Sequence, residues 1–113
     1  MVSKETFRKI ALSFDSVTEQ PHFQKTSFRI GTKIFATLDT ENKKAVVKLS
    51  EVDQSVFCAY NNQVMYPVAG SWGKQGWTMI ELTLVPKGML TDALQTAYQT
   101  LASSGKKSSR SKP

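Results

Sequence analysis

The residues best suited to chemistry lie in one eleven-residue stretch, 68–78, which holds three glycines, two tryptophans and one lysine. Glycine lets the backbone turn tightly at positive φ, so we predict a loop that leads into a strand beginning at Trp77. An exposed Trp72 can stack on a flat ring while Lys74 contacts a phosphate. The structural alternative is that Trp72 packs back as a lid and Lys74 is an ordinary solvated lysine. Trp77 begins the strand, and we predict that it belongs to the core.

A second candidate site consists of basic residues around a predicted hairpin. Their alternation with apolar residues allows a basic strip on the solvent face of a sheet, although scattered solvated charges are the alternative. His22 lies close in sequence; it either binds an anionic group or donates a hydrogen bond to a backbone carbonyl in its loop. Besides His22, the candidate nucleic-acid-binding residues are Lys74, Trp72, Arg29, Lys33, Lys25 and Lys48.

Catalytic and metal-binding patterns are missing from the sequence. The chain has one histidine and one cysteine, Cys58, which lack ligand-spaced companions. No serine lies in a G-x-S-x-G context. The glycines of the loop precede a strand and not a helix, so they do not form a phosphate-binding loop. We therefore predict that the protein is not an enzyme and that it uses no metal or cofactor.

The net charge of +6 is unevenly distributed along the 113 residues. Four of the basic residues lie in 103–113, and without them the rest of the chain carries eleven basic and nine acidic residues, a net charge of +2. The end segment lacks aliphatic and aromatic side chains, so we predict one domain over 1–102 and a disordered basic tail over 103–113. Such a tail either adds weak, sequence-independent affinity for nucleic acid or serves only solubility.

The remaining composition indicates a protein of a reducing compartment. A single cysteine excludes an intramolecular disulfide. The first residues lead directly into a polar helical pattern, so we expect no signal peptide, and no apolar run approaches the ~18 residues that a membrane span needs. We expect a monomeric cytoplasmic protein with no membrane association.

Hydrophobic periodicity predicts an α+β fold. The polar stretch 15–24, interrupted by Pro21, is predicted to be a loop. The remaining pattern has the order α-β-β-β-α-β-β-α, which favours an antiparallel sheet of about five strands with three helices packed on it. We predict helices over 4–13, 51–60 and 90–101, and strands over 27–30, 33–38, 45–49, 64–67 and 77–84.

The same periodicities assign side chains to faces. In the strand over 33–38, alternation places the side chain of Phe35 on the face of the sheet opposite to that of the residues on either side of it. Ser3 and Ser50 are predicted to be the N-caps of the first two helices. The residues expected to share one face of the strand are Ile34, Ala36 and Leu38, and those expected to be buried in helix 51–60 are Val52, Val56 and Ala59 or Tyr60.

The chain resembles the MmcQ/YjbR family of small bacterial proteins over about residues 7–102. The similarity lies in the order and spacing of several short motifs. They are Gly-Thr-Lys-Ile-Phe-Ala-Thr-Leu at 31–38, similar to the Gly-Lys-Met-Phe-Ala segment of that family, Val-Lys-Leu at 47–49, Lys-Gln-Gly-Trp at 74–77 and Ala-Tyr at 97–98.

This resemblance implies an α+β fold like that of the bacterial frataxin homologue CyaY, with a DNA-binding role for loops that act as wings. Two departures limit the transfer. Many members have His-x-Asn-Lys before the tryptophan, whereas Ser71 and Gly73 stand at the His and Asn positions here and only Lys74 is kept. Frataxins bind iron on an acidic helical ridge, but the first helical segment here offers only Glu5 and Asp15.

Two kinds of binding module remain open. The first binds double-stranded DNA weakly and salt-dependently through basic hairpin loops, and it requires Lys74, Arg29 and Lys33 to lie on one surface. The second binds a protein or a small ligand through the Trp72 loop and has no role with nucleic acid. It requires an apolar pocket or patch beside Trp72.

Overall fold

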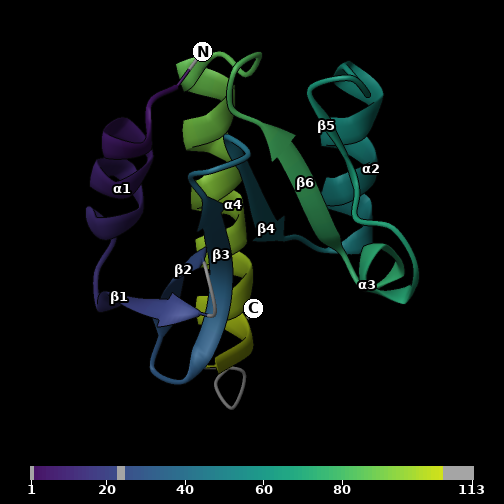
Figure 1. The fold of residues 1–113 in the computed structure, drawn as a ribbon. Coiled ribbons are helices and arrows are strands. Elements are labelled where there is room, and N and C mark those ends of the chain that lie inside the picture. Colours follow the sequence, from purple (N-terminus) through teal and green to yellow (C-terminus); the bar gives the residue numbers. More distant parts are fainter. Residues whose placement is uncertain (1, 23–24, 106–113) are drawn as a thin grey trace.

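Six antiparallel strands form one sheet in the order β1-β2-β3-β4-β6-β5 (Figure 1). The structure, a computed structural model, describes residues 2–22 and 25–105. The predicted α+β class and antiparallel sheet are confirmed. Along the chain the elements are α1 (Lys4–Leu12), β1 (Val17–His22), β2 (Lys25–Ile30), β3 (Lys33–Asp39), β4 (Lys44–Lys48), α2 (Glu51–Tyr60), β5 (Met65–Pro67), α3 (Ser71–Lys74), β6 (Trp77–Glu81) and α4 (Lys87–Gly105).

The additional strand, β1, occupies the stretch that we predicted to be a loop, so that prediction was wrong. In the described part of the chain β1 pairs only with β2, at the edge of the sheet. An edge position tolerates Pro21, which has no backbone N–H to donate. The strand is tied to α1 by Arg8, whose Nε and Nη2 donate hydrogen bonds of 2.8 and 2.7 Å to the carboxylate of Glu19.

The helix ends follow local sequence signals. Both predicted N-caps are confirmed: the Oγ of Ser3 accepts a hydrogen bond from the N–H of Thr6, and that of Ser50 accepts one from the N–H of Asp53. These bonds satisfy amide groups that have no partner inside the helix. At the other end of the chain, α4 continues to Gly105, into the segment that we predicted to be a tail. The rest of that predicted tail, 106–113, lies outside the described residues.

The buried stripe predicted for α2 is wrong. The side chains of Val52, Val56 and Tyr60 are 72%, 64% and 77% exposed. The helix turns a different side to the protein: Phe57 packs against the core. Beside it, the Nε2 of Gln54 donates hydrogen bonds of 2.9–3.2 Å to carbonyl and hydroxyl groups of the segment after β5.

This orientation of α2 places a polar side chain against the glycine segment. The acceptors of the Gln54 amide are the carbonyl oxygens of Gly73 and Trp77 and the hydroxyl of Thr78. The two carbonyl oxygens also accept backbone hydrogen bonds from the segment itself. The Gln54 amide therefore adds a side-chain link between α2 and this segment, while the apolar stripe of the helix stays exposed.

A β-bulge changes the faces that we predicted for β3. Phe28 pairs with Ala36, but the next residue, Arg29, pairs with Ile34, so Phe35 is the extra residue on β3. One extra residue inverts the alternation on one side of the bulge. Phe35 consequently joins Ala36 in the core, and Ile34 turns to the opposite face, which corrects the predicted arrangement.

The two faces of the sheet have different surroundings. Figure 1 shows α4 behind the middle of the sheet, α1 at one side and α2 at the other. The core lies between these helices and the sheet and includes Phe7, Phe28, Phe35, Ile80 and Leu94. The opposite face, which we call the open face, has no long helix of the described residues packed on it. Within 2–22 and 25–105, no helix is long and apolar enough to cross a membrane.

The connection from β5 to β6 contains the short helix α3 in place of the simple turn that we predicted. Gly76, at φ +104°, lies against the end of β4 and accepts a 2.9 Å hydrogen bond from the N–H of Leu49. A Cβ at this glycine would lie 1.8 Å from the carbonyl oxygen of Leu49. The close approach requires glycine, and it holds α3 and Trp72 against the sheet.

The Arg8–Glu19 pair makes the stability of the α1–β1 contact pH-dependent. The hydrogen bond from Arg8 lowers the pKa of Glu19 from its usual value of 4.5. A carboxyl whose pKa is lower in the folded state stabilises the protein above its unfolded pKa, and this contribution is lost as the pH falls through the folded value. We expect Glu19→Gln to lower the urea midpoint slightly at pH 7, with the difference shrinking as the pH falls below 4.5. Glu41→Gln, at an exposed glutamate without an ion pair to any described residue, is the control and should leave the urea midpoint near that of the parent.

Substitution of Gly76 tests whether its approach to Leu49 anchors the α3 segment. Gly76→Ala combines positive φ with a backbone clash, and we expect it to lower the free energy of unfolding by about 3 kcal/mol. Gly31→Ala is the matched control, because Gly31 also has a positive φ, +64°, but open space within 4 Å of its Cβ position. We expect that change to cost only about 1 kcal/mol. If urea unfolding showed the same loss of unfolding free energy in both variants, the anchoring role of Gly76 would be contradicted.

Candidate functional site

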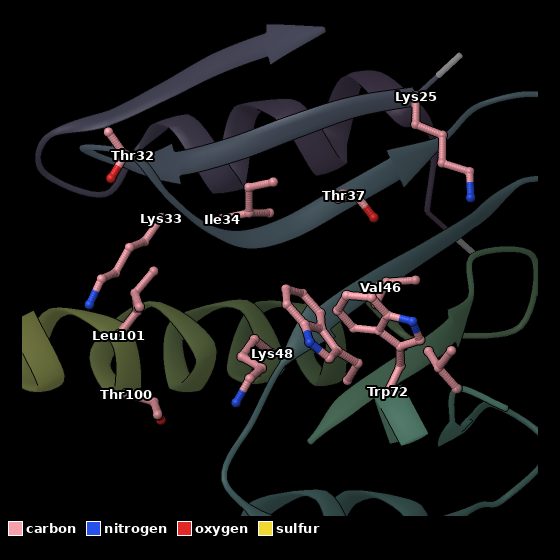
Figure 2. A pocket seen from close by; sticks show the side chains of 12 residues that line it. Lys25, Thr32, Lys33, Ile34, Thr37, Val46, Lys48, Trp72, Thr100 and Leu101 are labelled. Carbon is pink, nitrogen blue, oxygen red and sulfur yellow. The ribbon is translucent and has the colours of Figure 1, made fainter. Parts of the chain in front are cut away.

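A pocket of about 620 Å³ lies on the open face of the sheet. It spans the region where β3 and β4 diverge, with α4 visible behind the gap (Figure 2). Volumes of roughly 300–1,000 Å³ are typical of small-molecule sites. We call it the sheet pocket, and its lining residues are Lys25, Thr32, Lys33, Ile34, Thr37, Val46, Lys48, Val68, Trp72, Trp77, Thr100 and Leu101.

Two tryptophans form the aromatic wall of the sheet pocket. Their ring centroids lie 6.2 Å apart with an interplanar angle of 69°, an edge-to-face contact. Trp72 extends from α3 and is 60% exposed. The core position predicted for Trp77 is wrong: this residue is half-buried, because β6 turns Thr78 and Ile80 toward the core and its odd-numbered residues toward the open face.

The apolar floor of the pocket was not predicted from the sequence. Ile34 reaches it because of the bulge in β3, and Leu101 comes from the last turns of α4. Val46 was detectable in principle. Its neighbours Ala45 and Val47 are buried on the core face, so alternation along β4 places an apolar valine on the open face. An apolar residue at an outward position of a strand is therefore a local signal that could have revealed part of this floor.

Three lysines of the described chain supply charge to the sheet pocket, and none of the lining residues that the structure describes is acidic. Figure 2 shows Lys33 and Lys48 toward one end, where Thr100 and Leu101 of α4 also lie, and Lys25 at the other end beyond Thr37. These ammonium groups come from the starts of β2 and β3 and the end of β4. The pocket therefore combines an apolar interior with a positive rim.

An acidic residue elsewhere on the open face is already paired. Glu81 accepts a hydrogen bond from the hydroxyl of Tyr66 and forms an ion pair with Lys44, whose Nζ lies 3.3 Å from its Oε2. Hydrogen bonding to Glu81 raises the pKa of the Tyr66 hydroxyl and of the Lys44 ammonium, because a carboxylate favours the protonated form of its donor. The negative charge of Glu81 is thus compensated locally.

A second acidic residue, Asp39, lies near the Lys25 end. Its carboxylate accepts a 2.8 Å hydrogen bond from the side-chain amide of Asn42, which lowers the pKa of Asp39, and attraction to Lys25 lowers it further. Lys33 and Lys48 form no ion pair with any residue that the structure describes. The uncompensated positive charge of the pocket is therefore concentrated at their end.

The structure gathers four of the predicted site residues in the sheet pocket: Trp72, Lys25, Lys33 and Lys48. Lys74 is exposed on α3 but does not line the pocket. Arg29 is also outside it, and its Nε donates a 2.9 Å hydrogen bond to the Oγ of Ser27. The backbone of His22 ends β1 opposite Lys25, while its side chain lies outside what the structure describes.

Metal-binding and thiol chemistry have little support around this site. Among the described residues, no group of three or more His, Cys, Asp or Glu side chains is arranged to hold a metal ion. Cys58 lies on α2, and partial burial raises the pKa of its thiol, which disfavours the reactive thiolate. The arrangement can provide an apolar surface, aromatic contact and positive charge.

Comparison with known proteins agrees with the motif resemblance. The YjbR family model matches residues 12–100. The fold is similar to the crystal structure of Deinococcus radiodurans protein DR2400, described with the family domain DUF419, at a TM-score of 0.81 and 18% identity over 93% of this chain and 82% of that chain. At this identity the likeness shows the fold alone. No curated protein matches the sequence. Because the family match spans most of the chain, the protein belongs to the YjbR family.

Proposed function

We propose that this protein is a binding module that takes a small organic anion in the sheet pocket. The observation that carries the proposal is the composition of the pocket wall, which joins apolar and aromatic side chains to three lysines without an acidic residue. An apolar pocket beside Trp72 is the feature that we expected of a small-ligand module. Its lysines add a preference for negative charge.

The geometry supports a ligand with two unlike parts. An apolar or aromatic part gains by leaving water for the surface of Trp72, Val46 and Ile34. An anionic group gains by reaching Lys33 and Lys48, which the described acidic residues leave unpaired. A bare inorganic anion would use only the second contact, and an uncharged apolar molecule only the first.

The role that we propose is binding without catalysis. Among the side chains that the structure describes, the ionisable ones that line the sheet pocket are lysines. They provide charge, but general acid–base catalysis also needs a group that accepts a proton at the operating pH. The described lining residues include no carboxylate, histidine or cysteine.

Duplex DNA is the second candidate, because Lys25, Lys33 and Lys48 share the open face. Ammonium groups on one surface can contact successive phosphates. This candidate explains the lysines but leaves the apolar floor without a role. It also relies on Lys74, which is outside the pocket. We therefore favour the small organic anion.

A pair of matched probes tests the proposal. Anilinonaphthalene sulfonate carries two aromatic groups and one sulfonate, and N-phenyl-1-naphthylamine is the same ring system without the charge. We expect the sulfonate probe to bind saturably to the full chain, and Lys33→Gln/Lys48→Gln to weaken it about tenfold through the loss of two charge contacts. The uncharged probe should bind the parent and the double variant equally. Fluorescence titration measures both.

Lys74→Gln is the control variant, because it removes one exposed lysine of α3 that does not line the pocket. It should leave binding of the sulfonate probe unchanged. Equal loss in Lys74→Gln and in the double variant would contradict the pocket as the site. A labelled DNA duplex provides the opposite outcome. If the duplex binds, if its affinity falls steeply as the salt concentration rises, and if Lys74→Gln weakens it, the DNA candidate replaces this proposal.

A further inference from the structure

We propose that the ligand of the sheet pocket is nucleotide-like: a flat ring stacks on Trp72 and a phosphate attached to it contacts Lys33 and Lys48. This inference rests on the proposed function and specifies its ligand. It follows from three features of the pocket, namely the exposed aromatic surface, the position of the unpaired lysines and the size of the space between them.

The exposed surface of Trp72 is the first feature. Trp77 contacts this ring edge-to-face, with the centroids 6.2 Å apart, and so supports it from one side. The indole remains 60% exposed even though its backbone segment is anchored to β4 through Gly76 and Leu49. A rigidly supported, solvent-facing indole loses little freedom when a flat ring stacks on it, which is the way single bases are bound by aromatic side chains.

The phosphate position follows from the distribution of charge. Lys33 and Lys48 lie toward the same end of the pocket, whereas Lys25 lies at the other end, where it attracts Asp39. Thr100 also lines the pocket at the Lys33 end, but its hydroxyl already donates a 2.8 Å hydrogen bond to the carbonyl of Thr96. The two ammonium groups therefore carry the contact, and together they suit a phosphate, which has up to two negative charges and three acceptor oxygens.

The size and the polar groups of the pocket restrict the ligand further. A space of about 620 Å³ accommodates one nucleotide-sized molecule and excludes a duplex. No Asn, Gln, Asp or Glu side chain of the described residues lines it, so hydrogen bonds that would read the edge of a base are scarce there. We therefore infer that the ring is held by stacking, with a preference for large rings over small ones and little selection among bases of one size.

The same chemistry has two possible sources, a free nucleotide and a nucleotide unit of a single strand. A smaller depression of about 230 Å³ adjoins the sheet pocket and shares Lys25, Thr37 and Val46 with it. It also contains Asp39, which disfavours a second phosphate there. The pocket alone therefore favours the free nucleotide, and an oligonucleotide serves as a separate arm of the test.

The natural fluorescence of the chain reports directly on this site, because its two tryptophans both line the sheet pocket. We would titrate the full-length chain with adenosine monophosphate, adenosine and ribose 5-phosphate, with excitation at the red edge of tryptophan absorption and calorimetry as a second readout. Adenosine monophosphate should quench the emission saturably. Each fragment should bind at least tenfold more weakly, because it retains only one of the two contacts.

Variants assign each contact. Trp72→Leu should reduce the affinity for adenosine monophosphate to that of ribose 5-phosphate, and Trp72→Phe should restore part of it. Lys33→Gln/Lys48→Gln should reduce the affinity to that of adenosine and leave adenosine binding unchanged. Lys74→Gln should alter neither the affinity for adenosine monophosphate nor that for adenosine. Since all these side chains are exposed or line the open face, urea unfolding should show that the variants retain the parent's stability.

The outcomes separate this inference from the broader proposal. If ribose 5-phosphate binds as tightly as adenosine monophosphate, or if the nucleotide fails to bind while the sulfonate probe still requires Lys33 and Lys48, the nucleotide-like ligand is rejected and the anion pocket stands. If neither probe depends on these lysines, both proposals fail. Octadeoxyadenylate that binds more tightly than the mononucleotide identifies a single strand as the source, and weaker binding identifies the free nucleotide.

Discussion

The early separation of β3 from β4 is the feature on which the open face depends. The two strands are paired only between residues 36–39 and 44–47, and the first three residues of β3 have no partner in β4. The bulge at Phe35 lies at this point and strengthens the local twist. Thr100 and Leu101 of α4 reach the space between the strands. A single irregularity thus sends Phe35 into the core and opens a pocket whose floor is Ile34 and part of the helix behind the sheet.

The position of Trp72 depends on polar contacts made by its neighbours. Gly76 touches the backbone of Leu49 more closely than any side chain would allow, and the amide of Gln54 donates to carbonyl oxygens of the same segment. Both contacts join residues that are distant in sequence. The helix that supplies the amide turns Gln54 and Phe57 inward and leaves Val52 and Val56 exposed. Helical periodicity alone cannot reveal which side of the helix meets such a polar partner.

Local charge, more than net charge, distinguishes the open face. Four of the six excess positive charges belong to residues 103–113, and the rest of the chain is only mildly basic. What matters is that Glu81 and Asp39 already have partners, while Lys33 and Lys48 do not pair with any described acid. A charge without a nearby counterion retains more of its attraction for a ligand, and an adjoining apolar surface weakens screening by water.

Short-range patterns in the sequence determined several features of this protein. They are the α+β class, the helix caps at Ser3 and Ser50, the course of most strands, and the types of residue able to bind an anion. These depend on short-range periodicity, capping and side-chain chemistry. Only the tertiary structure decided that Trp77 faces outward, that Ile34 lies opposite Ala36, and that Lys25, Lys33 and Lys48 meet Trp72 while Lys74 does not. The reason is physical: a bulge, an edge strand and the rotation of a helix are set by hydrogen-bond partners distant in sequence.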